Sequence, residues 1–352
     1  MNRELLYNKL IEWYEVNHRI LPWRETDDPY KIWISEIILQ QTRVAQGMEY
    51  YHRLITRFPD IQSLADAEED EVLLYWQGLG YYSRARNLHK AAQLMKNHAI
   101  FHQEMRLLDD KARGEEIFAA LRSMPGVGDY TAGAIASFAF NLPYPALDGN
   151  VYRVLSRLYD CEIAFDTTQG KKHFRQLAEE LLDKERPRLF NSAIMELGAL
   201  HCVPTAPDCS TCPLNTWCKA LTNNTVELLP VRKPRPKVRD RYLEYTIYIA
   251  RDKTTLIHQR KGNDIWKHLW EFVCAERTGE EAIRRKAKGE NILELTHVLS
   301  HQKLHARFVI KNVSELPEIP DTVVVSLSDL DNYAFSRLTL KAIEKLLITY
   351  SL

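Results

Sequence analysis

Residues 121–153, LRSMPGVGDYTAGAIASFAFNLPYPALDGNVYR, decide how the rest of the chain is interpreted. Apolar residues at helical spacing precede Pro125, which ends the first helix, and a helical period resumes at Tyr130. Gly126 and Gly128 allow a sharp turn that exposes backbone N–H groups at the start of the second helix, where a phosphate binds favourably. The stretch predicts a helix-hairpin-helix that can hold a DNA backbone without reading its bases. An ordinary helix–helix connection is the alternative, because short glycine motifs also arise by chance.

Length and charge give weaker indications. A chain of 352 residues favours two domains, and 47 basic residues balance 47 acidic ones, so net charge predicts no partner. Residues 64–72 are acidic, whereas residues 81–90 and 231–241 are basic; a basic stripe can follow a phosphate backbone, although a solvated face is the commoner meaning. The N-terminus is amphipathic and no apolar run approaches the roughly 20 residues that span a bilayer. We expect a cytoplasmic protein without a membrane partner.

A carboxylate lies inside an apolar segment. Residues 32–44, IWISEIILQQTRV, predict a helix that is apolar nearly all round and therefore buried, with Glu36 in its middle. Burial is expected to raise the pKa of Glu36 toward the range useful for a general acid. The alternatives are that Glu36 lies on a solvated stripe or is paired with a basic residue. The polar residues at the end of this segment suit contact with base edges and equally suit helix termination.

Two segments combine aromatic rings with arginines. Trp23 and Arg24 stand in a polar loop, where packing is the simplest role of the indole and stacking on a base is the alternative. In GLGYYSRAR, residues 78–86, glycine turns precede Tyr81 and Tyr82. Such rings can stack on bases or wedge between them while arginines hold phosphates. Packing into the helical core is the competing interpretation, and we expect it for at least one of the two tyrosines.

Four cysteines within 17 residues predict a metal site. They follow the spacing C-x6-C-x2-C-x5-C, and they are Cys202, Cys209, Cys212 and Cys218. Four thiolates can surround one soft metal centre, and a long chain without a signal peptide argues against a disulfide framework. Zinc and a [4Fe-4S] cluster both accept four cysteines, although zinc sites more often use paired Cys-x-x-Cys knuckles.

The pattern changes toward the C-terminus. Residues 227–240 carry three prolines and a basic run, which is typical of an extended linker between domains. Beyond it the apolar period becomes two in five segments, and residues 332–350 close as a helix. The chain therefore predicts a multidomain protein: an all-α domain with a metal module, followed by an α+β domain.

Taken together, these segments resemble the MutY-type adenine DNA glycosylases of the helix-hairpin-helix, iron-sulfur superfamily. The matching motifs cover the whole chain in order: LPWR, SEIILQQT, GLGYYSRARNLHKAA, PGVGDYTAGAI, DGNVYRVLSRL, FNSAIMELG and the cysteine tail. The resemblance implies a base excision repair enzyme that flips adenine out of double-stranded DNA and removes it when it is mispaired with 8-oxoguanine, or with guanine. It also implies one [4Fe-4S] cluster on the four cysteines, and we expect a bacterial monomer.

The resemblance divides the chain into domains. The catalytic domain is expected over residues 1–225, with a six-helix barrel lobe over about 28–136 and an iron-sulfur lobe from 1–27 and 137–225. A linker over 226–240 would lead to a Nudix-like, 8-oxoguanine recognition domain over 241–352. No REUxEE carboxylate cluster follows Gly279, since residues 280–290 read EEAIRRKAKGE, so this domain is expected to recognise rather than hydrolyse.

The resemblance also assigns catalytic roles. Glu36 would protonate the adenine ring, and Asp148 would face the sugar and stabilise the cation or bond to it transiently. Asp148 can at the same time cap the helix that follows. Asn150 and Tyr130 match positions that orient this carboxylate and the water. The bifunctional, endonuclease III-type relatives carry a lysine where Tyr130 stands, and a tyrosine cannot form their Schiff base, so a monofunctional glycosylase is predicted.

Binding roles follow in the same way. The residues expected at the adenine pocket are Trp23, Arg24, Leu39 and Ser192. Relatives often carry a longer Gln or Glu in place of Ser192 to contact the adenine edge, and a water could replace that contact. The residues expected to bind DNA are Gln41, Thr42, Tyr81, Gly126, Val127 and Gly128. Ser300 and His301 are the candidates for contact with the oxidised guanine, against a structural role in a turn.

Two rival functions remain at this point. One is a pyrimidine-specific glycosylase and lyase, disfavoured by Tyr130 and by the long C-terminal domain. The other is a non-catalytic DNA-binding scaffold, disfavoured by the presence of both Glu36 and Asp148.

Overall fold

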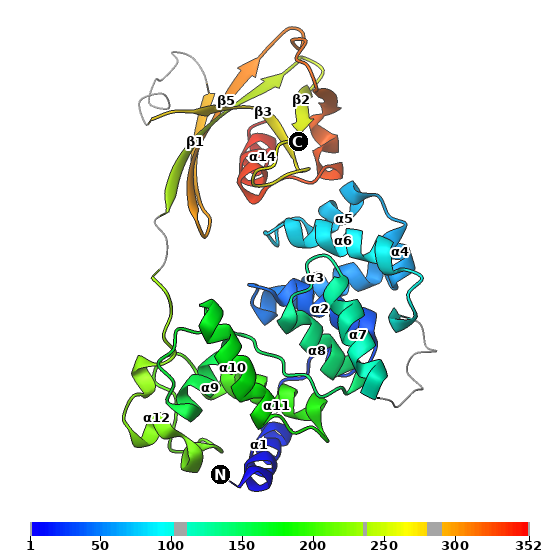
Figure 1. The fold of residues 1–352 in the computed structure, drawn as a ribbon. Helices are drawn as coiled ribbons and strands as arrows, with labels where there is room; N and C mark the ends of the chain where they lie inside the picture. The colour runs from blue at the N-terminus through cyan, green and yellow to red at the C-terminus, as the bar shows by residue number, and fades with distance from the viewer. Residues whose placement is uncertain (1, 102–110, 235–237, 280–290, 351–352) are drawn as a thin grey trace. The chain divides into compact units, whose positions relative to one another are not determined.

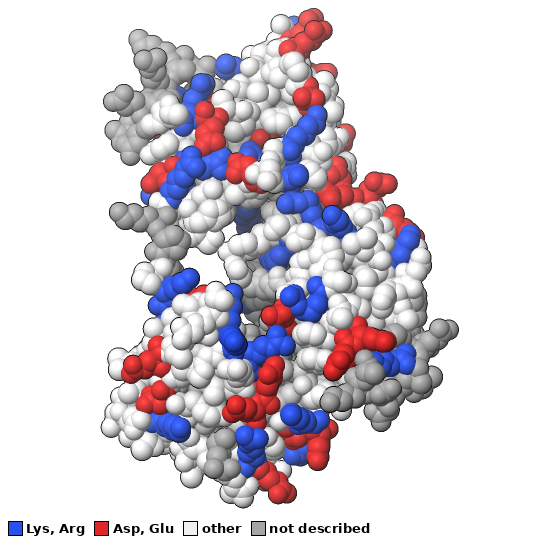
Figure 2. Space-filling model, in the orientation of Figure 1, with Lys and Arg blue, Asp and Glu red and all other residues white. Residues whose placement is uncertain are grey.

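A computed structural model describes residues 2–101, 111–234, 238–279 and 291–350 (Figure 1). The chain divides into two compact units: residues 1–51, 55–65 and 90–234 form the first, and residues 52–54, 66–89 and 235–352 form the second. Within the described ranges, every helix is too short or too polar to cross a bilayer. Acidic and basic side chains are interspersed over the visible face (Figure 2).

The first two thirds of the chain are helical, as predicted. The helices are α1 (Arg3–Asn17), α2 (Pro29–Leu39), α3 (Val44–Arg57), α4 (Ile61–Ala65), α5 (Glu69–Trp76), α6 (Ser83–Met95), α7 (Lys111–Ser123), α8 (Asp129–Phe140), α9 (Gly149–Tyr159), α10 (Thr168–Leu181), α11 (Pro187–Leu200) and α12 (Lys219–Thr222). Short 3-10 turns are η1 (Ala99–Phe101), η3 (Asn215–Trp217) and η4 (Val226–Leu228). The α5 helix and most of α6 are grouped with the second unit.

The α1, α9, α10 and α11 helices share one apolar core in the first unit. Leu6 and Leu10 of α1 are fully buried in it together with Leu155 of α9 and Phe174 of α10. The α9 and α11 helices approach closely because position 198 is a glycine, where an added Cβ would lie 2.7 Å from the Cβ of Asn150. This close approach fixes the N-terminal turn of α9 against α11.

The predicted helix-hairpin-helix is present as α7, the turn at residues 124–128, and α8. Gly126 has φ +80°, in the left-handed region that glycine adopts without strain. Gly133 lies inside α8, and an added Cβ there would come within 2.5 Å of the carbonyl oxygen of Pro145. The segment that leads to Asp148 can therefore lie directly on α8.

The helix predicted over residues 32–44 is shorter than expected. The α2 helix ends at Leu39, because Gln41 has φ +58° and breaks the helical geometry before α3 begins. Pro29 starts α2, and Asp28 caps it by accepting a hydrogen bond from the Tyr30 N–H at 2.9 Å.

The C-terminal third forms the expected α+β domain. Its strands are β1 (Arg239–Ile249), β2 (Thr254–Gln259), β3 (Trp270–Arg277), β4 (Asn291–Val298), β5 (Gln302–Asn312) and β6 (Val323–Ser326), in the sheet order β4-β5-β1-β3-β2-β6. β1 and β5 are parallel, with Tyr242 opposite His305, and the other neighbours are antiparallel. A 3-10 turn, η5 (Leu327–Asn332), and the helix α14 (Arg337–Tyr350) follow.

The core of this domain lies between the sheet and α14 (Figure 1). Tyr245 of β1 stacks on Phe308 of β5 with ring centroids 4.5 Å apart, and Leu338 of α14 is fully buried in the same cluster. Residues 280–290, where the sequence lacks the acids of a Nudix hydrolase, lie outside the described residues.

Candidate active site

Glu36 and Asp148 line one cavity of about 780 Å³ in the first unit. The cavity is bounded by α2, by the hairpin and the start of α9, by α11, and by the segment between α1 and α2. Twelve residues that the sequence singled out line it: Trp23, Arg24, Glu36, Leu39, Gln41, Thr42, Gly126, Gly128, Tyr130, Asp148, Asn150 and Ser192. Residues more than 150 positions apart are thereby brought to one site.

Two donors hold the Glu36 carboxylate. Its side chain is 1% exposed, Oε1 accepts from both terminal nitrogens of Arg24 at 3.3 Å, and Oε2 accepts from the Tyr130 hydroxyl at 2.6 Å. Glu36 is therefore paired with a basic residue, as one of the alternatives for this carboxylate proposed. The Arg24 guanidinium also lies over the ring of Phe138, 3.7 Å from its centroid. Burial and the neighbouring carboxylates raise the pKa of Tyr130 well above its ordinary value, so the hydroxyl stays protonated and donates.

Asp148 is the N-cap of α9. Its Oδ1 accepts from the backbone N–H groups of Asn150 and Val151 at 2.9 and 2.8 Å, and its Oδ2 accepts from the Asn150 amide at 2.8 Å. The expected capping role is confirmed. Burial raises the pKa of Asp148 above its ordinary value even though these three hydrogen bonds act to lower it.

Arg153 holds the Asn150 side chain in place. The guanidinium donates to Asn150 Oδ1 at 2.9 Å and, through Nε, to the carbonyl oxygen of Cys202 at 2.7 Å. Withdrawal from solvent lowers the pKa of Arg153 from its ordinary, very high value. A continuous chain of hydrogen bonds therefore runs from Asp148 to the backbone of the first of the four cysteines.

The hairpin turn offers backbone donors at the rim of the cavity. Gly128 is the N-cap of α8 and supplies no side-chain cap. Gly126 and Gly128 are exposed, whereas Val127 is 5% exposed, lies outside the cavity lining, and accepts a hydrogen bond from Arg122 through its carbonyl oxygen at 3.1 Å. An N-terminus arranged in this way suits a phosphate.

Gln41 and Tyr81 share an unusual backbone conformation. They have φ angles of +58° and +46°, which side-chain-bearing residues adopt at a cost, and both side chains are exposed. Tyr81 belongs to the second unit, where the Arg84 guanidinium lies 5.6 Å from the centroid of its ring. Tyr82, by contrast, is 4% exposed, so one of the two tyrosines packs in the core as expected.

The adenine-pocket candidates occupy different parts of the cavity wall. Trp23 is 1% exposed and packs edge-on against Tyr51, with ring centroids 5.1 Å apart, while its indole N–H has no hydrogen-bond partner among the described residues. Leu39 packs on Gly47, where an added Cβ would lie 2.8 Å from a Leu39 methyl carbon. Ser192 is 7% exposed on α11 and lines the cavity together with Tyr14 of α1.

Sequence reasoning missed several residues of this wall, among them Tyr14, Arg19 and Glu196. Arg19 donates to both carboxylate oxygens of Glu196, at 2.6 and 2.8 Å, and the Tyr14 side chain lies in the same lining. Glu196 could have been found from the sequence, because it lies four residues after Ser192 and residues four apart share a helix face. No local pattern indicates that residues of α1 reach this face.

The four cysteines line a second, smaller cavity of about 30 Å³. Arg157 is 2% exposed and donates to the Cys202 Sγ at 3.4 Å and to the carbonyl oxygen of Val203 at 2.8 Å. Among the described residues, no three His, Cys, Asp or Glu side chains converge on a single ion position.

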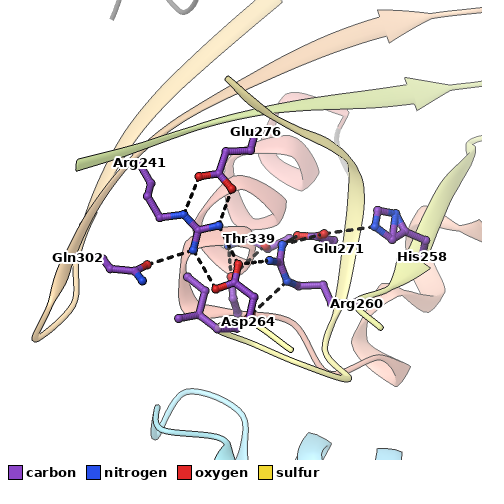
Figure 3. A network of polar contacts seen from close by, with 10 residues as sticks. Arg241, His258, Arg260, Asp264, Glu271, Glu276, Gln302 and Thr339 are labelled. Atoms are coloured by element: carbon purple, nitrogen blue, oxygen red, sulfur yellow. Dashed lines mark hydrogen bonds and ion pairs between the residues drawn. The ribbon is translucent and has the colours of Figure 1, made fainter. Parts of the chain in front are cut away.

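Ser300 and His301 form the exposed turn between β4 and β5, with Ser300 Oγ 3.2 Å from His301 Nδ1. The next residue, Gln302, accepts from Arg241 at 3.1 Å (Figure 3). Arg241 also pairs with both oxygens of Glu276 and of Asp264, at 2.6 to 3.0 Å. The turn is thus attached to a network of ion pairs across β1, β3 and the loop after β2, which Arg260, Glu271 and His258 extend.

Comparisons with known proteins decide the family. Residues 34–184 match the HhH-GPD superfamily base excision DNA repair proteins, and residues 245–345 match the NUDIX domain. An adenine DNA glycosylase of Buchnera aphidicola subsp. Baizongia pistaciae is 36% identical over 324 residues, which cover 87% of this chain and 85% of that protein. The chain belongs to the adenine DNA glycosylase family.

Other similar proteins agree. The adenine DNA glycosylase of Schizosaccharomyces pombe is 40% identical over 334 residues, covering 78% of this chain and 70% of that protein. Among solved structures, a thermostable thymine-DNA glycosylase matches with a TM-score of 0.53 at 25% identity, covering 63% of this chain and 97% of that one. A non-covalent endonuclease III–DNA complex, with a TM-score of 0.50 at 21% identity over 64% of this chain and 99% of that one, shows the same fold. The family model and the curated relatives together make this chain a DNA glycosylase of base excision repair.

Proposed function

We propose that this adenine DNA glycosylase removes adenine opposite 8-oxoguanine, and opposite guanine, by a monofunctional hydrolysis carried out by a monomer. The observation that carries the proposal is the convergence of Glu36, Asp148 and Tyr130 on one cavity beside the hairpin. A flipped nucleotide placed there has one carboxylate for its base and the other for its sugar.

The chemistry requires these two carboxylates in different roles. Glu36 delivers a proton to the adenine ring, so that the base leaves as a neutral molecule, and then accepts a proton from the attacking water. Asp148 faces the sugar carbon and stabilises the positive charge that develops as the N-glycosidic bond breaks. The contacts of Tyr130 with Glu36 and of Asn150 with Asp148 hold both groups in position.

The tyrosine at the hairpin supports a monofunctional reaction. Tyr130 stands at this position, and its hydroxyl is used in the contact with Glu36. A Schiff base with the sugar requires a lysine or an N-terminal amine. We therefore expect base release without strand cleavage by β-elimination.

The four cysteines are proposed to hold a [4Fe-4S] cluster. Each thiolate of such a cluster binds a different iron, so the sulfurs need to surround one cavity rather than one ion, which agrees with their common lining. Cys202, Cys209, Cys212 and Cys218 would hold the cluster, and Arg157 would donate to the Cys202 sulfur. The cluster would stabilise the fold. The side chains proposed to take part in the reaction, Glu36 and Asp148, line the other cavity.

The C-terminal domain is proposed to recognise 8-oxoguanine. Ser300 and His301 are exposed at a turn that the Arg241 network supports, and both side chains offer a donor and an acceptor. Oxidised guanine differs from guanine by a carbonyl and an N–H on its Hoogsteen edge, which such groups can distinguish.

Single-turnover release from matched duplexes tests the proposal. We expect adenine to be released fastest opposite 8-oxoguanine, more slowly opposite guanine, and barely opposite thymine, with no adduct trapped by borohydride. Equal release opposite all three bases would refute the lesion specificity, and a trapped adduct at the full rate of base release would refute the monofunctional mechanism. Iron and sulfide analysis tests the cluster, and zinc without iron would refute it.

A further inference from the structure

The loop between α1 and α2 carries two residues of the cavity wall. Trp23 and Arg24 both line the cavity, and the Arg24 guanidinium donates to Glu36 Oε1 at 3.3 Å. Residues 18–28 lie between the two helices, so no regular ladder of backbone hydrogen bonds fixes the place of Arg24. Such a loop holds a side chain in position only if other elements of the fold bind its backbone.

The α11 helix, on which α1 packs (Figure 1), binds this loop at two places. Near the start of α11, one terminal nitrogen of Arg188 donates to the carbonyl oxygens of Arg24 at 3.0 Å and of Thr26 at 2.8 Å. About two turns further along, Glu196 accepts from the backbone N–H of Arg19 at 3.0 Å and from its guanidinium. One helix therefore holds the chain both before and after the residues that line the cavity.

Arg188 is suited to hold the loop. Its side chain is half-buried, and its backbone N–H donates to the side-chain oxygen of Asn141, the C-cap of α8, at 3.3 Å. A guanidinium is always charged, so its hydrogen bonds to carbonyl oxygens are charge-assisted and stronger than those between neutral groups. Arg188 is not among the described residues that line the cavity, so an effect on the reaction has to pass through the loop.

We propose that Arg188 is a positioning residue of the glycosylase reaction: by holding the backbone of Arg24, it keeps the Arg24 guanidinium against Glu36. The inference rests on the proposed role of Glu36 as the general acid. It adds to the two direct donors of this carboxylate a third residue, on another helix, that determines where one of those donors stands.

Single-turnover release of adenine at saturating enzyme separates positioning from binding. Arg188→Met keeps much of the length of the side chain and removes its donors. The variant is expected to slow release at least about tenfold, because a displacement of about 1 Å at a reacting group can cost about a hundredfold. The dissociation constant of the duplex should stay close to that of wild type, since the change acts on the placement of Arg24.

Arg186→Met is the matched control. Arg186 is the N-cap of α11, and its guanidinium pairs with Asp183 at 2.8 Å instead of with the loop. The variant removes the same charge from the same end of the helix, and it is expected to release adenine at the wild-type rate. Thermal melting of each variant verifies that it is folded.

A double mutant tests whether Arg188 acts through Arg24. Arg24→Met should itself slow the release of adenine. Adding Arg188→Met should then slow it little further, because the effects of two residues in one hydrogen-bond network are not additive. A merely structural role of Arg188 predicts the same loss of rate in both backgrounds.

The outcomes separate the inference from the proposed function. Release by Glu36→Gln at the wild-type rate contradicts the proposed function. If Glu36→Gln is inactive, release by Arg188→Met as fast as by Arg186→Met refutes the positioning role. An undiminished effect of Arg188→Met in the Arg24→Met background, or an effect confined to weaker binding of the duplex, refutes it as well.

Discussion

Replacing Asn150 with alanine tests how the enzyme keeps Asp148 ready for reaction. The substitution removes the amide that donates to Asp148 Oδ2 at 2.8 Å and leaves the two backbone donors of the cap in place. Burial already raises the pKa of Asp148, and the Asn150 side chain is one of the groups that oppose this. The variant therefore raises the pKa of Asp148 further.

The size of this effect follows from the hydrogen bond. A bond to a charged group contributes about 1.5–3 kcal/mol. Losing a contribution of this size from the ionised form alone should raise the pKa of Asp148. Asp148 must be ionised to stabilise a cation. As the pH is lowered, the variant should therefore lose activity at a higher pH than wild type does.

The assay is the pH dependence of single-turnover adenine release. Asn223→Ala is a matched control, because Asn223 makes the same kind of contact, with Asp160 Oδ2 at 2.7 Å, away from the cavity. We expect the acidic limb to move to higher pH in Asn150→Ala and to stay in place in Asn223→Ala. A uniform loss of rate at every pH, with an unmoved limb, would refute the electrostatic role of Asn150.

Three further predictions concern stability and recognition. Asp148→Asn should melt close to wild type, because asparagine keeps an oxygen for the backbone cap and removes a carboxylate whose pKa burial raises, which offsets the lost contact with the Asn150 amide; a large drop in the melting temperature contradicts this. Gly126→Ala should cost about 1 kcal/mol of stability because of its φ of +80°, whereas Gly128→Ala, at φ −90° with open space around the added Cβ, should cost little in chemical denaturation. Arg241→Leu should lower the preference for 8-oxoguanine over guanine because it frees Gln302; an unchanged ratio of release rates contradicts this.

Local patterns sufficed for much of the active site. Glycines around a proline mark a hairpin because few other residues adopt its backbone angles, and Gly126 has the expected positive φ. An aspartate ahead of a helical period marks an N-cap, and Asp148 is one. Such features depend on neighbours in sequence, so they can be predicted without knowing the fold.

Long-range partners could not be predicted in this way. The Arg24 partner of Glu36 was one of several basic residues available, and only packing of the loop onto α2 selects it. The placement of Tyr14 and Ser192 on one cavity wall brings together residues 178 positions apart in the chain and depends on how α1 lies on α11. The end of α2 at Leu39 was missed because the polar residues after it suit a continuing helix as well as helix termination, and Gln41 has a positive φ although it is not a glycine.

The central claim is that Glu36 and Asp148 together break the N-glycosidic bond. The most direct measurement is single-turnover release of adenine from a duplex that carries it opposite 8-oxoguanine, for wild type, Glu36→Gln and Asp148→Asn. Both variants keep the shape of the side chain, so binding of the duplex should persist. Release should fall by at least about a hundredfold in each, which is the low end of what one general acid or one stabilising charge contributes. Release within a few fold of wild type by either variant, with the duplex fully bound, would contradict the account.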